Sequence, residues 1–111
     1  MKTDLLSMGY RCLGTNAAGV TVWAKPFGNT LLVIAVSGAD LTLAQHFKGR
    51  DGQSLVWSTQ KYDQAQDGTL LQWIQYTETF HVKTGIGYGS PNTESYAFLT
   101  AEQKMEALLD K

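Results

Sequence analysis

The amino-acid sequence predicts a single α+β domain over residues 1–111, with an antiparallel sheet of about five strands and two or three helices packed on one face. Three observations lead to this fold class. Between residues 10 and 60, apolar residues recur at every second position or in short continuous runs, as in β-strands. Turn signals separate these runs closely, so consecutive strands should pair in antiparallel fashion. Beyond residue 69 the apolar spacing becomes that of amphipathic helices.

The first elements along the chain are short. Residues 4–8 are mostly apolar and end at Gly9, which is typical of a short helix. A first strand is expected at 10–14, because the turn signal Asn-Ala-Ala-Gly follows at 16–19. The chain then enters the longer runs that should form the centre of the sheet.

Two neighbouring runs predict the middle strands. Residues 20–25 alternate between an apolar side and a side that holds Thr21, Trp23 and Lys25. We therefore expect Trp23 to lie on the polar face of its strand. Residues 31–36, Leu-Leu-Val-Ile-Ala-Val, are apolar at every position, which predicts a central strand covered on both faces.

Residues 40–48 fit either a strand or a helix by their apolar spacing alone. The strand is favoured, because Asp51 and Gly52 form a strong hairpin signal that joins this segment to a further strand at 54–60. Strict alternation within that strand predicts one shared face for Leu55, Trp57 and Thr59.

Two capping boxes mark the starts of the later helices. Thr69 and Gln72 have the spacing in which each side chain caps the other's backbone, so a helix is expected over 69–82. Thr100 and Gln103 repeat the spacing and predict a second helix that runs to the end of the chain.

The composition indicates a protein that associates with itself. Charged residues make up 17% of the chain and the formal net charge is −1, whereas about 25% is ordinary for a globular domain. Neutral polar residues replace them, with 12 Thr, 8 Gln, 6 Ser and 3 Asn. Such a surface repels its neighbours weakly, so we expect a homodimer. The nine basic residues are scattered, and a nucleic-acid partner is therefore not expected.

The cysteine content and the apolar runs bear on the compartment. Cys12 is the one cysteine of the chain, so no internal disulfide can form, which favours a reducing compartment. The longest apolar run, at 31–36, is too short to cross a bilayer. Asp4 and Gly9 interrupt the first residues before any run of signal-peptide length. These features predict a cytoplasmic protein without a membrane segment.

The segment 84–92, Thr-Gly-Ile-Gly-Tyr-Gly-Ser-Pro-Asn, resembles a phosphate-binding loop only in its glycines. The dinucleotide fingerprint needs its third glycine where this chain has Ser90, and it must follow a strand rather than a helix. We interpret the segment as a long connection. Because such loops often carry binding residues, Tyr88 is a candidate contact residue.

No residue pattern predicts a catalytic centre, a metal site or a cofactor. His46 and His81 are far apart in sequence, and neither belongs to a spacing typical of metal ligands. Cys12 lies within an expected strand, where a thiol is usually inert.

The aromatic residues are the most suggestive feature of the sequence, with three Trp, five Tyr and four Phe. Core packing accounts for most aromatic residues in ordinary domains. Trp and Tyr are also favoured where proteins bind one another. The second interpretation predicts an exposed binding cluster of Trp23, Phe27, Trp57 and Tyr62.

Two hypotheses of function follow. The first is a small cytoplasmic, non-enzymatic interaction protein that binds itself or another protein, and its size would suit an accessory protein of a mobile element or phage. The alternative is a small-molecule-binding protein or small enzyme with a pocket between the sheet and the 69–82 helix, covered by the segment 84–92. The polar groups of that pocket would be His46, Tyr62, Asp63 and Tyr88.

Overall fold

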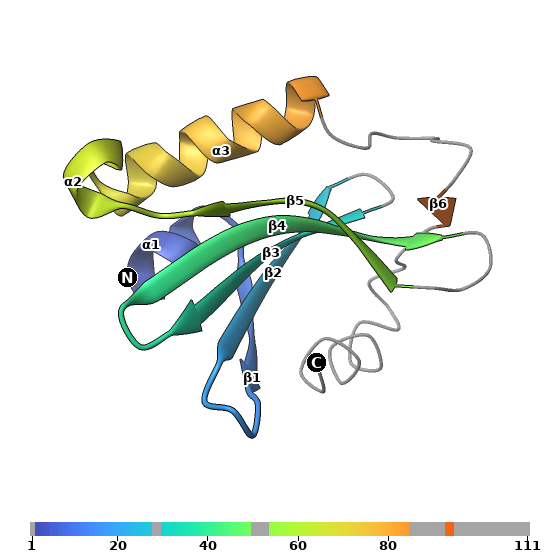
Figure 1. Ribbon diagram of the computed structural model, residues 1–111, viewed down its shortest axis with the longest axis horizontal. Helices are drawn as coiled ribbons and strands as arrows, with labels where there is room; N and C mark the ends of the chain where they lie inside the picture. Colours follow the sequence, from blue (N-terminus) through green and yellow to red (C-terminus); the bar gives the residue numbers. More distant parts are fainter. Residues whose placement is uncertain (1, 28–29, 50–53, 85–92, 95–111) are drawn as a thin grey trace.

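The computed structural model describes residues 2–27, 30–49, 54–84 and 93–94 (Figure 1). Within this part the chain forms a five-stranded antiparallel sheet of order β1–β2–β3–β4–β5, and a short sixth strand pairs with β4. Three helices accompany the sheet, so the predicted α+β fold is confirmed. In chain order the elements are α1 (Lys2–Ser7), β1 (Arg11–Thr15), β2 (Thr21–Phe27), β3 (Thr30–Ser37), β4 (Asp40–Gly49), β5 (Ser54–Lys61), α2 (Gln64–Asp67), α3 (Leu70–Thr84) and β6 (Thr93–Glu94).

The ambiguous segment 40–48 is the strand β4, as favoured from the hairpin signal. Ser37 pairs with Asp40, which leaves a two-residue loop between β3 and β4. Gly38 in this loop has a φ of 58°, a left-handed conformation that glycine adopts without strain. The expected hairpin residues Asp51 and Gly52, the segment 85–92 and the helix predicted from Thr100 lie outside the described residues.

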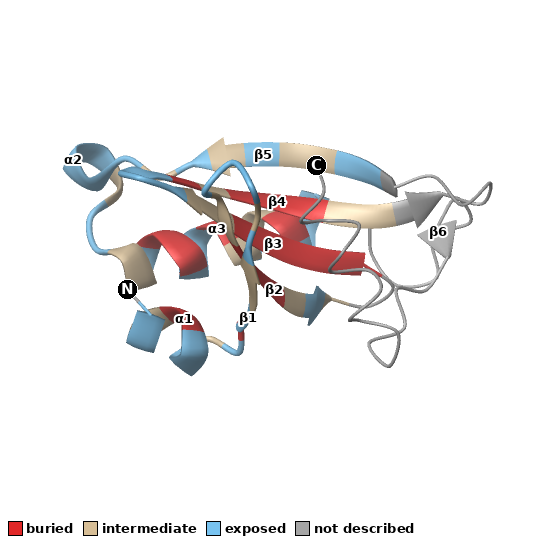
Figure 2. Cartoon of the chain, turned by 90° about the horizontal axis from the view of Figure 1, so that it is seen from below, coloured by how far each residue is buried: buried red, intermediate tan, exposed pale blue. Residues whose placement is uncertain are grey.

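The larger of two apolar clusters lies on the face of the sheet that α1 and α3 cover. Leu5 of α1 and Ile74 of α3 are fully buried there against residues of the central strands. Figure 2 shows the burial concentrated in the middle of the sheet and on the facing sides of these helices. We call this the helix-side core; its buried members are Leu5, Tyr10, Trp23, Leu32, Ile34, Leu41, Leu43, Trp73 and Ile74.

The opposite face of the sheet carries a smaller cluster, made of Val22, Ala24, Leu31 and Val33. Leu32 and Ile34 point to the helix side, so β3 is buried on both faces. This confirms the central position predicted from the continuous apolar run.

Trp23 is not on an exposed face, so this expectation was wrong. Its side chain is 6% exposed and belongs to the helix-side core, where Trp23 pairs with Ile34. This side of β2 was predicted to be polar because it also holds Thr21 and Lys25. Lys25 in fact reaches across to α3, where its Nζ lies 2.8 Å from Glu78 Oε1. The ion pair therefore closes over a face that also buries the tryptophan.

A β-bulge in β5 contradicts the prediction that Leu55, Trp57 and Thr59 share one face of the strand. Ala44 pairs with Thr59 and Gln45 with Trp57, so Ser58 is an extra residue with no partner on β4. Its φ is 53°, a left-handed value that is uncommon outside glycine. Trp57 therefore shares the helix side with Gln60 and not, as predicted, with Thr59.

The helix α3 confirms the prediction for 69–82 and its capping box. The Thr69 N–H donates to Gln72 Oε1 at 3.1 Å, and the Gln72 N–H donates to Thr69 Oγ1 at 3.2 Å. Among the described residues, no helix is both long and apolar enough to cross a membrane.

Candidate functional site

The predicted aromatic cluster does not form one exposed surface. Trp23 is buried, and Phe27 packs at the margin of the helix-side core. Trp57 stacks on Phe80 near the end of α3, with 5.9 Å between ring centroids, whereas Tyr62 lies against Trp73 near its start. Trp23, Phe27 and Tyr62 therefore belong to the helix-side core or its margin, whereas Trp57 lies in a separate aromatic contact. The fifth candidate, Tyr88, lies outside the described residues.

The polar groups predicted for a pocket are also separated. His46 pairs with Leu31, a residue of the cluster on the face away from α3, so His46 does not face the space between sheet and helix. Asp63 is exposed and caps α2 by accepting a 3.0 Å hydrogen bond from the Ala65 N–H. The backbone N–H of Tyr62 donates a hydrogen bond to Leu41 O. Leu41 and His46 are five residues apart on β4, which corresponds to about 17 Å along the strand. The pocket proposed from sequence is not assembled from these residues.

Tyr62 borders a surface groove at the end of the sheet where α1, the β3–β4 loop, α2 and the start of α3 come together. We call it the Tyr62 groove. Its volume is about 430 Å³. It is lined by Asp4, Val36, Gly38, Ala39, Asp40, Leu41, Tyr62, Gln64, Thr69 and Leu70.

Three contacts hold Tyr62 in place as a wall of this groove. Its backbone N–H donates to Leu41 O at 2.8 Å, and its hydroxyl donates to Gly68 O at 2.5 Å. Its ring packs against the buried Trp73, with 5.2 Å between the centroids. Because both ends of the side chain are tied down, the ring presents a fixed apolar surface.

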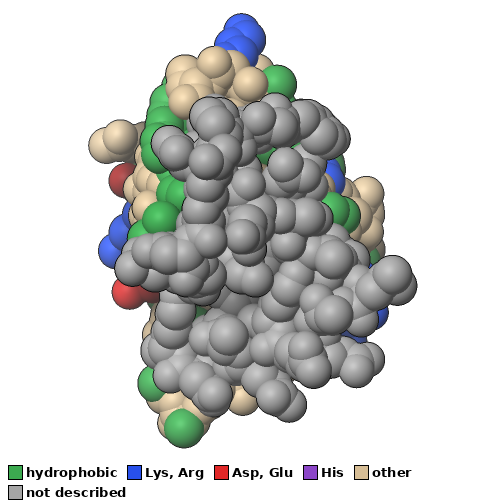
Figure 3. Space-filling model, turned by 90° about the vertical axis from the view of Figure 1, so that its right-hand side faces the viewer, with side chains coloured by type: hydrophobic (Ala, Val, Ile, Leu, Met, Phe, Trp, Pro, Cys, Tyr) green, Lys and Arg blue, Asp and Glu red, His purple; other side chains and the backbone are tan. Residues whose placement is uncertain are grey.

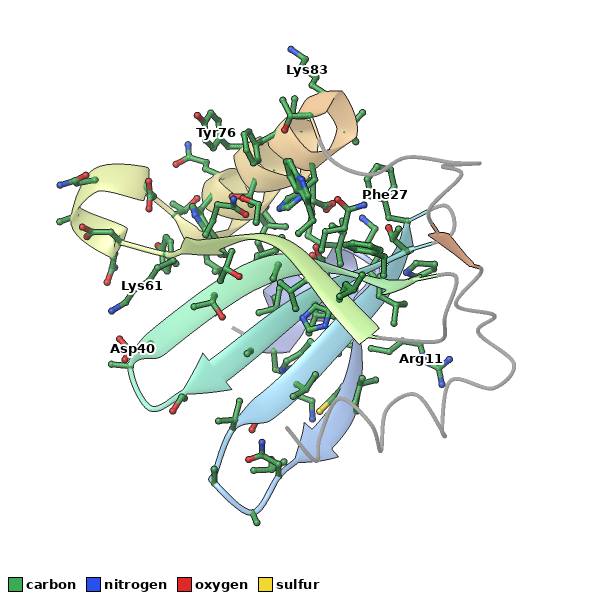
Figure 4. The ribbon with its side chains drawn as sticks, turned by 45° about the vertical axis from the view of Figure 1, so that its right-hand side comes forward. Arg11, Phe27, Asp40, Lys61, Tyr76 and Lys83 are labelled. Carbon is green, nitrogen blue, oxygen red and sulfur yellow. The ribbon has the colours of Figure 1, made fainter. Side chains whose placement is uncertain are left out.

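The outer face of α3 is a second feature, and its exposed residues are almost all uncharged. Tyr76 and Val82 are 74% and 65% exposed, and Figure 4 shows Tyr76 and Lys83 projecting from the helix away from the sheet. We call this surface the α3 outer face. It consists of Gln72, Gln75, Tyr76, Thr79, Val82 and Lys83.

A second groove, the α2–α3 groove, adjoins the α3 outer face. It has a volume of about 400 Å³ and is lined by Gln66, Asp67, Gln72, Trp73 and Tyr76. Tyr76 thus stands beside a hollow on the same surface. The sequence contained the signal for this face, since the segment Gln-Trp-Ile-Gln-Tyr-Thr-Glu-Thr at 72–79 has one charge in two helical turns.

His81 lies in a cluster between α3 and β5 and is fully buried. Its Nε2 is 2.8 Å from Gln60 Oε1, and the amide nitrogen of Gln60 donates to Ser58 Oγ. The Trp57 ring meets the imidazole edge-on at 5.4 Å. Burial lowers the pKa of His81, so the ring is neutral at pH 7 and donates its Nε2 proton to Gln60. This arrangement positions α3 on the sheet and offers no open path to a substrate.

Tyr10 is held beside the ion pair of Lys25 and Glu78. Lys25 Nζ lies 5.5 Å from the centre of the Tyr10 ring. Burial, and secondly the negative charge of Glu78, raise the pKa of the Tyr10 hydroxyl far above its ordinary value. The hydroxyl is buried and makes no hydrogen bond of normal geometry. A phenol of this kind stays neutral and serves packing.

The part of the chain that the structure describes holds no group of three His, Cys, Asp or Glu side chains that could bind a metal ion. On the side of the molecule seen in Figure 3, the described basic side chains stand as separate groups rather than as one patch. What the described residues do present is a small α+β protein with two surface grooves and a helix face whose one charged residue is Lys83. Comparison of the chain with models of protein families, with curated protein sequences and with solved structures gave no match.

Proposed function

We propose that this protein works by binding, without catalysing a reaction, and that two copies associate through the α3 outer face. The observation that carries the proposal is the exposure of Tyr76 and Val82 on a helix face that has no charged residue before Lys83. Solvent-facing sides of helices are usually charged, whereas protein interfaces are depleted in charge and enriched in tyrosine.

The shape of this surface supports a second copy as the partner. In a two-fold dimer the same patch serves both subunits, so a projection must find its complement on its own surface. Tyr76 is such a projection, and the α2–α3 groove beside it is a hollow floored by Trp73. Two copies related by a two-fold axis near Tyr76 would each place this ring in the partner's groove. The neutral face avoids repulsion between identical charges.

The sheet edges are poorly suited to pairing with a second copy. Both outer strands of the sheet carry a register shift, between Cys12 and Gly14 in β1 and at Ser58 in β5. Bulges of this kind twist an edge away from a straight partner strand. The helix face is therefore the preferred dimer contact.

The size of the surface sets the expected affinity. A helix of 15 residues is about 22 Å long, which supplies less than the roughly 800 Å² per partner of a standard interface. Even with the α2–α3 groove added, the dimer belongs to the weak, reversible class. We expect a dissociation constant of about 1–100 μM.

The proposal extends to the compartment. Cys12 is exposed and free, and an accessible thiol is maintained best in a reducing environment. We therefore place the working protein in the cytoplasm.

Sedimentation velocity over a range of protein concentrations tests the dimer. We expect Tyr76→Ser and Val82→Ser to weaken association about tenfold or more, since apolar truncations at interface centres cost at least one decade in affinity. Val56→Ser is the matched control, because Val56 is 49% exposed on the edge strand β5. A wild-type chain that stays monomeric at several hundred micromolar, or a loss caused by Val56→Ser instead, refutes the helix-face dimer.

A further inference from the structure

We infer that the Tyr62 groove binds a small organic cation, an ammonium group attached to a flat apolar body. Among the described residues, the Tyr62 groove and the α2–α3 groove share no lining residue, and nothing in the inference depends on dimerisation. It rests on three observations: the apolar floor, the fixed aromatic wall and the sign of the charges at the rim.

The floor and wall suit an apolar body. Val36, Leu41 and Leu70 contribute aliphatic surface from three different elements. The Tyr62 ring stands beside them, held by its bonds to Leu41 and Gly68 and by Trp73 behind it. Ligand sites in proteins typically combine such apolar surface with a few convergent polar groups, and a fixed wall loses little entropy when a ligand binds.

The rim selects a positive charge. Asp4 of α1 and Asp40 at the start of β4 both line the groove, and none of the described lining residues is Lys or Arg. The Tyr62 ring in the same groove attracts an ammonium ion through its π face, and the carboxylates attract it by charge. An anionic ligand would meet two like charges and no cation among the described lining residues.

Lys61 forms an ion pair with Asp40 of this rim. Its Nζ lies 3.1 Å from Asp40 Oδ1, and Figure 4 shows the two side chains meeting at the outer end of the sheet. Both side chains are 66% exposed, and ion pairs of that kind are weak and exchange readily. The Asp40 carboxylate can therefore turn to a bound ammonium group without a large loss.

The dimensions set the class of ligand. A volume of about 430 Å³ falls in the range of small-molecule sites, roughly 300–1,000 Å³. A single-ring amine occupies part of it. For such a fragment in an open groove, we expect a dissociation constant of about 1 mM.

The test uses 2-phenylethylamine, which is an ammonium ion at pH 7, and 3-phenylpropionate, which has a similar shape and the opposite charge. Each is titrated into the ¹⁵N-labelled full chain and followed by amide chemical shifts. We expect the amine to shift the amides of Gly38, Ala39, Asp40, Tyr62, Gln64 and Thr69, and the acid to leave them in place. Equal shifts from both compounds, no shifts, or shifts that map elsewhere would overturn the inference.

Variants then test the roles of charge and ring. Asp40→Asn should weaken amine binding about two- to fivefold, the size expected for an exposed ion pair. Asp63→Asn is its control, because it removes the same charge outside the groove lining while asparagine still caps α2. Tyr62→Leu should weaken binding by a similar factor, and Tyr76→Leu should not. Equal losses in Asp40→Asn and Asp63→Asn would show a diffuse charge effect and refute the site.

Discussion

Acidification should destabilise this protein through one buried histidine, His81. The folded state keeps the ring neutral, because burial lowers its pKa below the ordinary 6.5. Its neighbours on α3 and β5 are uncharged: Trp57 and Phe80 pack on the ring, and Gln60 Oε1 accepts a hydrogen bond from its Nε2–H. Glu78, one turn earlier, is bound to Lys25. No described carboxylate therefore stabilises a protonated His81.

The sign and size of the effect follow from linkage. The unfolded chain binds a proton at His81 as the pH falls through 6.5, whereas the folded chain does so only at lower pH. The stability supplied by the neutral ring is thus complete above pH 6.5 and is lost as the pH falls below it. With one proton of difference, the free energy of unfolding falls by up to about 1.4 kcal/mol per pH unit. Lowering the pH from 7.5 to 5.5 should therefore cost up to about 1.4 kcal/mol from this group alone.

Urea unfolding at these two pH values, followed by circular dichroism at one protein concentration, measures the loss. The comparison is with His81→Gln, whose amide can still donate to Gln60 and cannot be protonated. Contributions from carboxylates are common to both proteins and cancel in the difference. His46→Gln serves as control and should keep the full loss, because it retains His81. If wild type and His81→Gln lose the same stability within about 0.3 kcal/mol, the accuracy expected for independent sites, the reasoning about His81 is wrong.

Two further predictions concern local backbone features and are read from thermal unfolding, where about 1 kcal/mol corresponds to roughly 4–8 °C in a domain of similar size. Thr69→Ala removes the hydroxyl that caps the Gln72 N–H and should cost about 1 kcal/mol, whereas Thr69→Ser should cost much less; equal midpoints for both variants would contradict the capping role. Gly38→Ala meets no atom within 4 Å, so its expected cost of about 1–2 kcal/mol comes from the positive φ alone. Asparagine tolerates that φ better than alanine, so Gly38→Asn should lose less stability. An unchanged midpoint in Gly38→Ala would refute the left-handed conformation of Gly38.

The features that the sequence predicted well are those determined by neighbouring residues. The capping box of Thr69 and Gln72 involves four consecutive positions, and it forms as expected at the start of α3. The run at 31–36 is apolar on both sides, so any placement other than the centre of the sheet would have exposed it. The hairpin signal after residue 48 was enough to decide between strand and helix for β4.

The side on which a residue lies depended on distant partners, and here local reasoning failed. Thr21 and Lys25 marked one side of β2 as polar, and the sequence near them holds no sign of Glu78 more than fifty residues later. Once that carboxylate pairs with Lys25, the polar-looking side can be covered by α3 and can bury Trp23. His46 was likewise predicted to face a pocket beneath the 69–82 helix. Its pairing with Leu31 places it on the face of the sheet away from α3.

The bulge at Ser58 shows why the candidate site was harder to predict than the fold. On each side of Ser58 the alternation of β5 is regular, with Gln60 opposite Leu43 and Trp57 opposite Gln45. The one unpaired residue between them moves the side chains of the preceding β5 residues to the opposite face of the sheet, because the side-chain period of a strand is two. A serine with a φ of 53° is uncommon, and no glycine marks the position in the sequence. The reversal brings Trp57 onto Phe80 and His81, where it anchors the end of α3. The same anchoring holds the opposite side of the helix, with Tyr76 and Val82, toward solvent, where it is available to a partner.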